Sequence, residues 1–415
     1  MVLLLVQMTI VLLTALLFGW VARRLGQGRV IGEIIGGIFI GPSVFGRVAP
    51  HASAVLFPPG SLGSFEVLST VGLILFLFLI GTELDYQQLY QQRRTAAFAS
   101  SLSIVLPFMM AAAVAHSLRV RFAPDAIGGI PFGLFLGISM SITAFPVLVR
   151  ILEERRMLAT ALGTTALMCA AVSDVCAWVL LAVALALIPH SGESMGLWPR
   201  LIGLCVYFAV MLGVIRPLGK WLVRRRKDVA FSYELLGITV AFVLGSAAAT
   251  EALGVHPLFG AFMAGACFPR LDGLIRELRT RIYMIVSILF LPLFFALTGM
   301  RTRLDLLSGR STWTWIGVVL VIAVVGKMGG AAIAARWTGE SWRDALALGA
   351  LLNTRGLVEL IVLNIAYNAH VFSSTLFTML VMMALITTMM TTPILNLLGV
   401  GNGRHEGSDI AEMER

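Results

Sequence analysis

The sequence predicts an all-α polytopic membrane protein with about 13 transmembrane helices. Of its 415 residues, 58% are hydrophobic and only 13% are charged, whereas soluble globular proteins average about 45–50% apolar and about 25% charged residues. Apolar runs of about 20 residues recur along the whole chain, and each is long enough to cross a hydrocarbon core about 30 Å thick. The segments between these runs are too short to form a soluble domain.

Thirteen spans are expected, of which the second and ninth are short and the sixth is long. No positive charge precedes the first run, and Arg23 and Arg24 follow it, which is the reverse of a cleavable signal peptide. The first run is therefore expected to remain as a spanning helix. The expected spans are 2–22, 30–46, 63–82, 95–117, 130–152, 158–188, 199–222, 231–251, 255–268, 282–300, 313–335, 345–368 and 374–398.

The distribution of positive charge predicts the orientation of the chain. Loops that follow odd-numbered spans carry about three times as many Lys and Arg residues as loops that follow even-numbered spans. Cytoplasmic loops are the ones enriched in these residues, so the N-terminus is expected outside and the C-terminus in the cytoplasm. The expected location is a bacterial inner membrane. The net charge of +9 is thus explained by membrane topology, and no nucleic-acid partner is expected.

Charged side chains at mid-membrane mark candidate functional positions, because each costs about 2.5–3.5 kcal/mol on insertion scales. Four lie deep within spans: Asp174 in the sixth, Lys327 in the eleventh, and Arg355 and Glu359 in the twelfth. A desolvated carboxylate at Asp174 can bind a proton or a small cation, but hardly both together. The alternative is a structural ion pair between Asp174 and Lys327. The i, i+4 spacing of Arg355 and Glu359 lets these two charges neutralise each other.

Two spans are expected to be interrupted. In the fifth, Pro146 lacks an N–H and clashes with the carbonyl of Ile142, and this carbonyl with the hydroxyl of Thr143 suits a dehydrated cation. In the twelfth, Asn353 and Gly356 place polar and flexible backbone at mid-span. Helices seven apart run in opposite directions, and interrupted helices at equivalent places in two inverted halves indicate a transporter site.

Other classes of protein fit the sequence less well. The four cysteines lie inside apolar runs, and the six histidines are scattered without metal-ligand spacing. An enzyme is therefore not expected, and no metal or cofactor is expected beyond transported ions. An ion channel would need a continuous polar lining, whereas the deep charges cluster in three helices.

Five blocks of sequence resemble the monovalent cation:proton antiporter-2 family, which includes bacterial potassium and sodium antiporters and plant cation/H+ exchangers. Each block is modestly specific alone, but five in order over nearly the whole chain are very specific. The blocks are residues 32–43, 77–85, 143–148, 255–262 and 353–360.

The resemblance implies the sodium/proton antiporter fold, with two crossed discontinuous helices, and a secondary antiporter of Na+ or K+ against H+ that serves pH homeostasis. It implies that Asp174, with Ser173 and Thr143, binds the ion. Lys327, Arg355 and Glu359 would balance charge, and whether Lys327 or Arg355 pairs with Asp174 stays open. Because Ser173 stands where electrogenic relatives have a first aspartate, electroneutral exchange is expected. A transporter of organic anions with the same fold is the alternative.

The resemblance also implies a division of labour along the chain. Residues 1–398 would form the transmembrane antiporter domain and 399–415 a short cytoplasmic tail, with no nucleotide-binding domain. The partners implied are membrane lipid and a second copy of the chain in a homodimer. The expected parts are a dimer scaffold at 1–82 and 231–300, a mobile core at 95–188 and 313–398, and a linker helix at 199–222.

Overall fold

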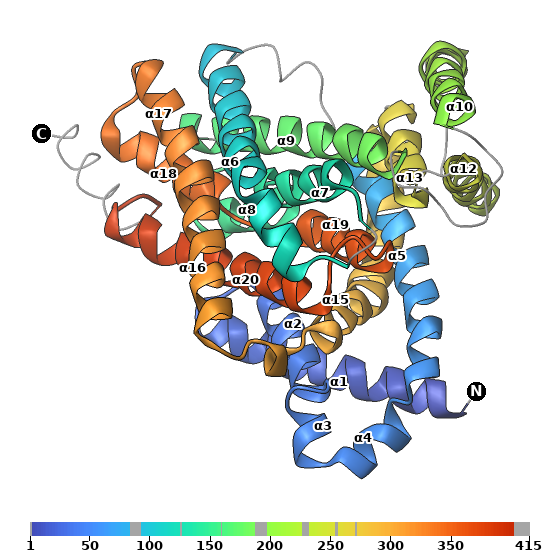
Figure 1. Ribbon diagram of the computed structural model, residues 1–415. Coiled ribbons are helices and arrows are strands. Elements are labelled where there is room, and N and C mark those ends of the chain that lie inside the picture. Colours follow the sequence, from blue (N-terminus) through green and yellow to red (C-terminus); the bar gives the residue numbers. More distant parts are fainter. Residues whose placement is uncertain are drawn as a thin grey trace, which may run out of the picture. The chain divides into compact units, whose positions relative to one another are not determined.

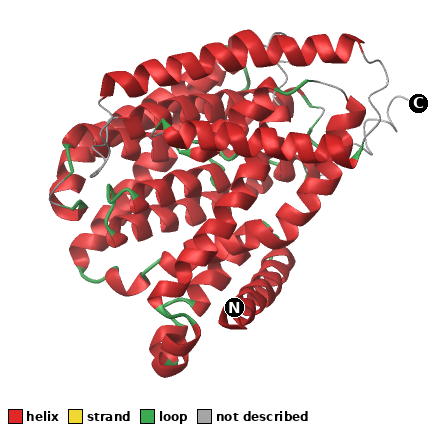
Figure 2. Ribbon diagram, turned by 90° about the vertical axis from the view of Figure 1, so that its right-hand side faces the viewer, coloured by secondary structure: helices red, strands yellow, loops and turns green. Residues whose placement is uncertain are grey.

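The structure is a computed structural model that describes residues 2–83, 93–124, 127–158, 160–186, 197–225, 232–253, 256–269 and 272–401. Within these ranges every regular element is a helix and there is no strand (Figure 2). Among the described residues, ten helices are long and apolar enough to cross a membrane, and a bent pair of helices between residues 342 and 368 makes an eleventh span. The predicted fold class, an all-α polytopic membrane protein, is confirmed.

The chain divides into two compact units, each of which is assembled from segments that are distant in the sequence. Unit 1 comprises Met1–Trp20, Gly32–Asp85 and Ala182–Arg301, and unit 2 comprises Val21–Ile31, Tyr86–Leu181 and Thr302–Arg415. The helices that begin before residue 85, or between residues 197 and 301, belong mainly to unit 1. They are α1 (Val2–Arg24), α2 (Arg29–Ile40), α3 (Phe45–Val48), α4 (Pro50–Leu56), α5 (Leu62–Glu83), α10 (Leu197–Val210), α11 (Arg216–Arg225), α12 (Tyr233–Ala252), α13 (Pro257–Cys267), α14 (Asp272–Ile285) and α15 (Leu291–Arg301).

Unit 1 packs through glycines that bring helix backbones together. A Cβ at Gly265 of α13 would lie 2.1 Å from the carbonyl oxygen of Phe78 in α5, and a Cβ at Gly81 would lie 2.3 Å from the carbonyl oxygen of Phe262. Small residues at such crossings are the usual basis of helix association in lipid, where the hydrophobic effect between helices is weak. Gly81 and Phe262 each fall in one of the family-like sequence blocks, so those blocks encode helix packing as well as chemistry.

Unit 2 contains the remaining helices. The long α6 is a single span, whereas several others are short helices that continue one another across a break. They are α6 (Arg93–Phe122), α7 (Gly129–Ser141), α8 (Phe145–Glu154), α9 (Ala161–Ala186, whose last residues fall in unit 1), α16 (Arg310–Val324), α17 (Gly330–Trp337), α18 (Trp342–Leu352), α19 (Leu357–Asn368) and α20 (Ser374–Leu397).

Both predicted interruptions are present, and Figure 1 labels the four half-helices. Helix α7 ends at Ser141 and α8 begins at Phe145, so the break occupies residues 142–144 and Pro146 lies in the first turn of α8. A proline is tolerated there because the first N–H groups of a helix have no intrahelical acceptor. Helices α18 and α19 are separated by residues 353–356 and are bent by 42° relative to each other.

The predicted eleventh span contains a short π-helix, η6 (Val325–Gly329), between α16 and α17. Lys327 lies at the centre of this segment. A π-helix accommodates one more residue per turn than an α-helix and is frequent at functional sites. The irregularity thus coincides with the buried charge of this span.

We expect Gly265→Ala to destabilise the protein, because its new methyl group would collide with the backbone of α5 at 2.1 Å. Overpacking of this kind lowers the free energy of unfolding by about 1–3 kcal/mol. The measurement is the midpoint of thermal unfolding of the purified protein in mild detergent. Gly245→Ala is the matched control, because a Cβ at Gly245 of α12 meets no atom within 4 Å. Equal midpoints for the two variants would contradict the close crossing of α5 and α13.

Candidate functional site

The two helix breaks of unit 2 lie against each other. The backbone N–H of Ala144 donates to the carbonyl of Thr354 at 3.0 Å, and the hydroxyl of Thr143 donates to the carbonyl of Leu352 at 3.0 Å. Segments about 210 residues apart in sequence are therefore joined by direct hydrogen bonds, and both are buried. The non-helical backbone of each break is thus enclosed by protein, which is where such backbone is tolerated at membrane depth.

Two buried cations bind the C-terminal end of α7. The guanidinium of Arg355 donates from Nη1 to the carbonyl of Ser139 at 2.7 Å and from Nη2 to the carbonyl of Met140 at 2.8 Å. The ammonium of Lys327 donates to the carbonyl of Ser141. The last carbonyls of a helix lack intrahelical donors and carry partial negative charge. Arg355 and Lys327 therefore satisfy and neutralise the end of the interrupted helix.

Glu359 forms an ion pair with Arg355. The distance from Nη1 of Arg355 to Oε1 of Glu359 is 3.1 Å, and neither side chain is exposed to solvent. Glu359 lies in the first turn of α19, where the positive end of the helix dipole favours an acid. Its second oxygen, Oε2, has no hydrogen-bond partner within the described part of the chain. The charge of Arg355 is therefore balanced by Glu359, whereas Lys327 has no such ion pair among the described residues.

Asp174 lies in α9, beside the break between α7 and α8. Asp174 is 2% exposed, and its Oδ1 is buried without a hydrogen-bond partner among the described residues. The neighbouring Ser173 accepts a hydrogen bond from the N–H of Thr143 at 3.2 Å and donates to the carbonyl of Ser141 at 3.4 Å. These bonds hold α9 against the break and fix the position of Asp174.

The structure separates the roles of the two candidate partners of Asp174. Arg355 pairs with Glu359, whereas the charge of Lys327 acts on Asp174 electrostatically. Among the described residues no basic group lies within the 4.0 Å of a direct ion pair with Asp174. The carboxylate is thus balanced from a distance and is not tied up by a permanent partner.

Asn353 contributes a second unpaired polar group at the crossing. The residue is 1% exposed, and both amide atoms, Oδ1 and Nδ2, lack a partner in the described ranges. A buried amide without partners is costly, by about 1–3 kcal/mol per unsatisfied group. Nearby, Gly356 allows close approach of the break to α8, because a Cβ there would lie 2.7 Å from Cγ2 of Val147. The crossing therefore retains unused oxygen atoms from both Asp174 and Asn353.

Sequence reasoning missed the threonines of α20 that support the crossing. The hydroxyl of Thr388 accepts the backbone N–H of Arg355 at 3.0 Å and donates to its carbonyl at 2.8 Å. The hydroxyl of Thr391 lies 3.5 Å from that of Thr354. The i, i+3 spacing of these threonines within an apolar span was the available signal. Thr388 therefore replaces the backbone partners that Arg355 loses where the helix is broken.

The sequence pattern of the family described as "Sodium/hydrogen exchanger, transmembrane" matches residues 12–397 of this chain. The chain belongs to this family. It is therefore an integral membrane protein of a transporter family, as the resemblance to cation:proton antiporters predicts.

Similar proteins and a similar structure support this assignment. The chain is 39% identical to the "Na(+)/H(+) antiporter NhaS4" of Synechocystis sp., with 95% of this chain and 96% of that protein covered. It is 32% identical to the "K(+)/H(+) antiporter 1" of Saccharomyces cerevisiae, with 90% of this chain but 43% of the yeast protein covered. Its fold is similar to that of the sodium proton antiporter MjNhaP1 from Methanocaldococcus jannaschii, with a TM-score of 0.68 at 16% identity over 95% of this chain and 99% of that chain.

We expect Thr388→Val to destabilise the crossing, because valine leaves both the N–H and the carbonyl of Arg355 without their partner. Each buried group left unsatisfied costs about 1–3 kcal/mol. The measurement is again the midpoint of thermal unfolding in detergent. Thr387→Val is the control, because the hydroxyl of Thr387 bonds only to carbonyls of its own helix. If Thr387→Val lowers the midpoint as much as Thr388→Val, α20 does not support the break specifically.

Proposed function

We propose that this chain is a secondary active antiporter that exchanges Na+ or K+ for H+, with Asp174 as the group that carries either ion. The observation that carries the proposal is a buried carboxylate, at the crossing of two broken helices, whose Oδ1 has no partner among the described residues. An ionised carboxylate is very costly to bury alone. A proton or a monovalent cation removes that cost, and the two compete for the same oxygen atoms.

Oxygen atoms around the crossing could complete the shell of a dehydrated cation. Asp174 and Asn353 each offer an unpaired oxygen, and the carbonyl of Ile142 has no helical donor because position 146 is a proline. Thr143 and Ser173 donate their protons to carbonyls and keep acceptor lone pairs. Rings of such oxygens replace the hydration shell of a monovalent ion. Neutral ligands with one carboxylate suit an ion of single charge.

Antiport by alternating access is the mechanism that this arrangement suits. All the residues proposed to bind or balance the ion belong to unit 2, so we propose that the core at 95–188 and 313–398 moves as one body. The scaffold at 1–82 and 231–300 would support a homodimer, with 199–222 as the linker. We place the chain in a bacterial inner membrane with its N-terminus outside. The names of the cyanobacterial and yeast relatives support both Na+ and K+ as substrates.

We expect Asp174→Asn to abolish exchange, because asparagine neither titrates nor offers a charge to a cation. The measurement is the recovery of the fluorescence of an internal pH dye when Na+ or K+ is added to proteoliposomes. The variant should behave like empty liposomes while its unfolding midpoint remains close to that of the parent protein. Glu251→Gln serves as the control, because Glu251 is an exposed acid at the end of α12, and it should exchange normally. Exchange by Asp174→Asn at the parent rate would refute the proposal.

We expect electroneutral exchange of one cation for one proton, because Glu359 is paired with Arg355 and Asp174 is the other buried acid among the described residues of unit 2. An imposed membrane potential, set with K+ and valinomycin while Na+ is the substrate, should leave the initial rate unchanged. A rate that rises with the potential, or a transport current on a solid-supported membrane, would show that a second proton is carried. Lys327 would then be the first residue to test.

A further inference from the structure

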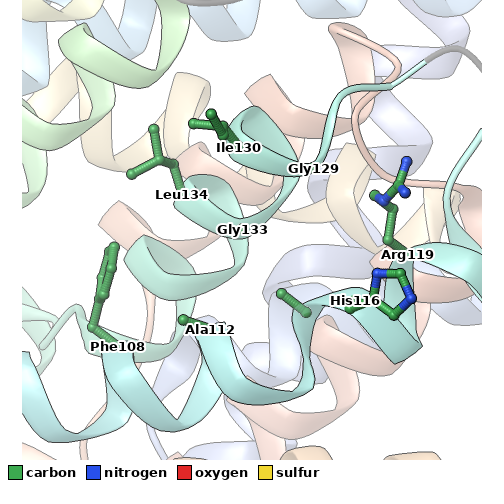
Figure 3. A pocket seen from close by; sticks show the side chains of 9 residues that line it. Phe108, Ala112, His116, Arg119, Gly129, Ile130, Gly133 and Leu134 are labelled. Carbon is green, nitrogen blue, oxygen red and sulfur yellow. The ribbon is translucent and has the colours of Figure 1, made fainter.

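A groove lies between α6 and α7 of unit 2, apart from the helix crossing (Figure 3). Its volume is about 390 Å³, which falls within the range of about 300–1,000 Å³ that is typical of ligand pockets. Phe108 and Leu134 lie toward one end, and Arg119 with His116 lies at the other. None of these residues takes part in the ion site proposed above.

The groove exists because small residues line both helices. Ala112 and Ala115 contribute little volume from α6, and Gly129 and Gly133 contribute no side chain from α7. A Cβ at Gly133 would just reach contact with the Cβ of Ala115, at 3.8 Å, and glycine leaves that space empty. The backbone thereby leaves a hollow that the chain itself does not fill.

The groove opens toward the hydrocarbon of the membrane. On the same two helices, Val105, Met109 and Ile130 are 53%, 60% and 72% exposed. Helix α6 has 30 residues and is thus about 45 Å long at 1.5 Å per residue, more than the roughly 30 Å of the hydrocarbon core. Arg119, three residues before the end of α6, therefore lies at the level of the lipid headgroups.

The polar end of the groove retains unused hydrogen-bond donors. Arg119 donates from Nη1 to the carbonyl of Ile127 at 3.0 Å, which orients the guanidinium at the mouth of the groove. Its remaining nitrogens make no hydrogen bond to the described residues. His116 lies one turn earlier on the same face of α6. Phe108 is about 16 Å from Arg119 along the helix axis, about half of the hydrocarbon thickness.

We infer that this groove binds an anionic phospholipid, with the headgroup phosphate at Arg119 and His116 and one acyl chain between Phe108 and Leu134. The positive charge selects a headgroup of net negative charge, and the arginine binds its phosphate through several donors. The apolar walls and the depth of the groove select a long chain. A free anion would use only the basic end, so the occupant with the matching chemistry over the whole groove is a lipid of the surrounding leaflet.

The experiment is native mass spectrometry of the purified full chain with phosphatidylglycerol and with phosphatidylcholine of the same acyl chains. Phosphatidylglycerol should remain bound where phosphatidylcholine does not. Arg119→Ala should weaken this binding about fivefold, since a basic residue near the surface contributes about that factor. Gly133→Leu should abolish it by filling the groove. Gly133→Ala, which meets only ordinary contact at 3.8 Å, tests whether position 133 tolerates a side chain.

Arg121→Ala is the matched control for charge, because Arg121 lies on the same helix end but donates to Ser311 at 2.6 Å. It should retain phosphatidylglycerol as the parent protein does. The proposal is overturned if Arg119→Ala and Arg121→Ala weaken binding equally, since the effect would then be general electrostatic attraction. It is also overturned if a folded Gly133→Leu binds phosphatidylglycerol as well as the parent protein, or if phosphatidylcholine binds equally.

Discussion

The carbonyls at the end of α7 must find hydrogen-bond donors inside a membrane protein, where no bulk water can supply them. Arg355 and Lys327 supply these donors from two other helices. The arrangement of the buried charges in unit 2 follows from this requirement. Glu359 is needed to offset the guanidinium, and Thr388 is needed to hold the backbone from which that guanidinium projects.

The same requirement explains why no basic group in the described part of the chain forms a direct ion pair with Asp174. A lysine engaged with a backbone carbonyl is held in place, so its charge acts on the carboxylate without closing an ion pair. The two Nη atoms of Arg355 are engaged with two carbonyls and a glutamate. A structural ion pair between Asp174 and Lys327 was the simplest alternative to an ion site, and no such pair lies within 4.0 Å among the described residues. In the proposed mechanism, the positive charges stabilise the scaffold of the site and leave the acid free to exchange ligands.

Much of the fold was predictable, because membrane helices must be apolar over a fixed length and must satisfy their own backbone. Runs of hydrophobic residues therefore located the spans, and Pro146 and Gly356 located the two interruptions to within a few residues. The supporting contacts were less predictable. Thr388 reads as an ordinary threonine of an apolar helix, and only the three-dimensional structure shows that it faces the backbone of Arg355. The unpaired amide of Asn353 is another case, because a sequence shows that a residue is polar but not that its partners are missing.

The π-helix at residues 325–329 makes the length of its span as constrained as its composition. Deleting one residue would let the segment close into a regular α-helix and would remove the wide turn at whose centre Lys327 lies. Lys327 would then leave the carbonyl of Ser141. We therefore expect relatives to differ here in their side chains while keeping the same number of residues. Insertions and deletions are instead expected in the connections between spans, and a gap placed here in an alignment would shift the residues of the proposed ion site out of register.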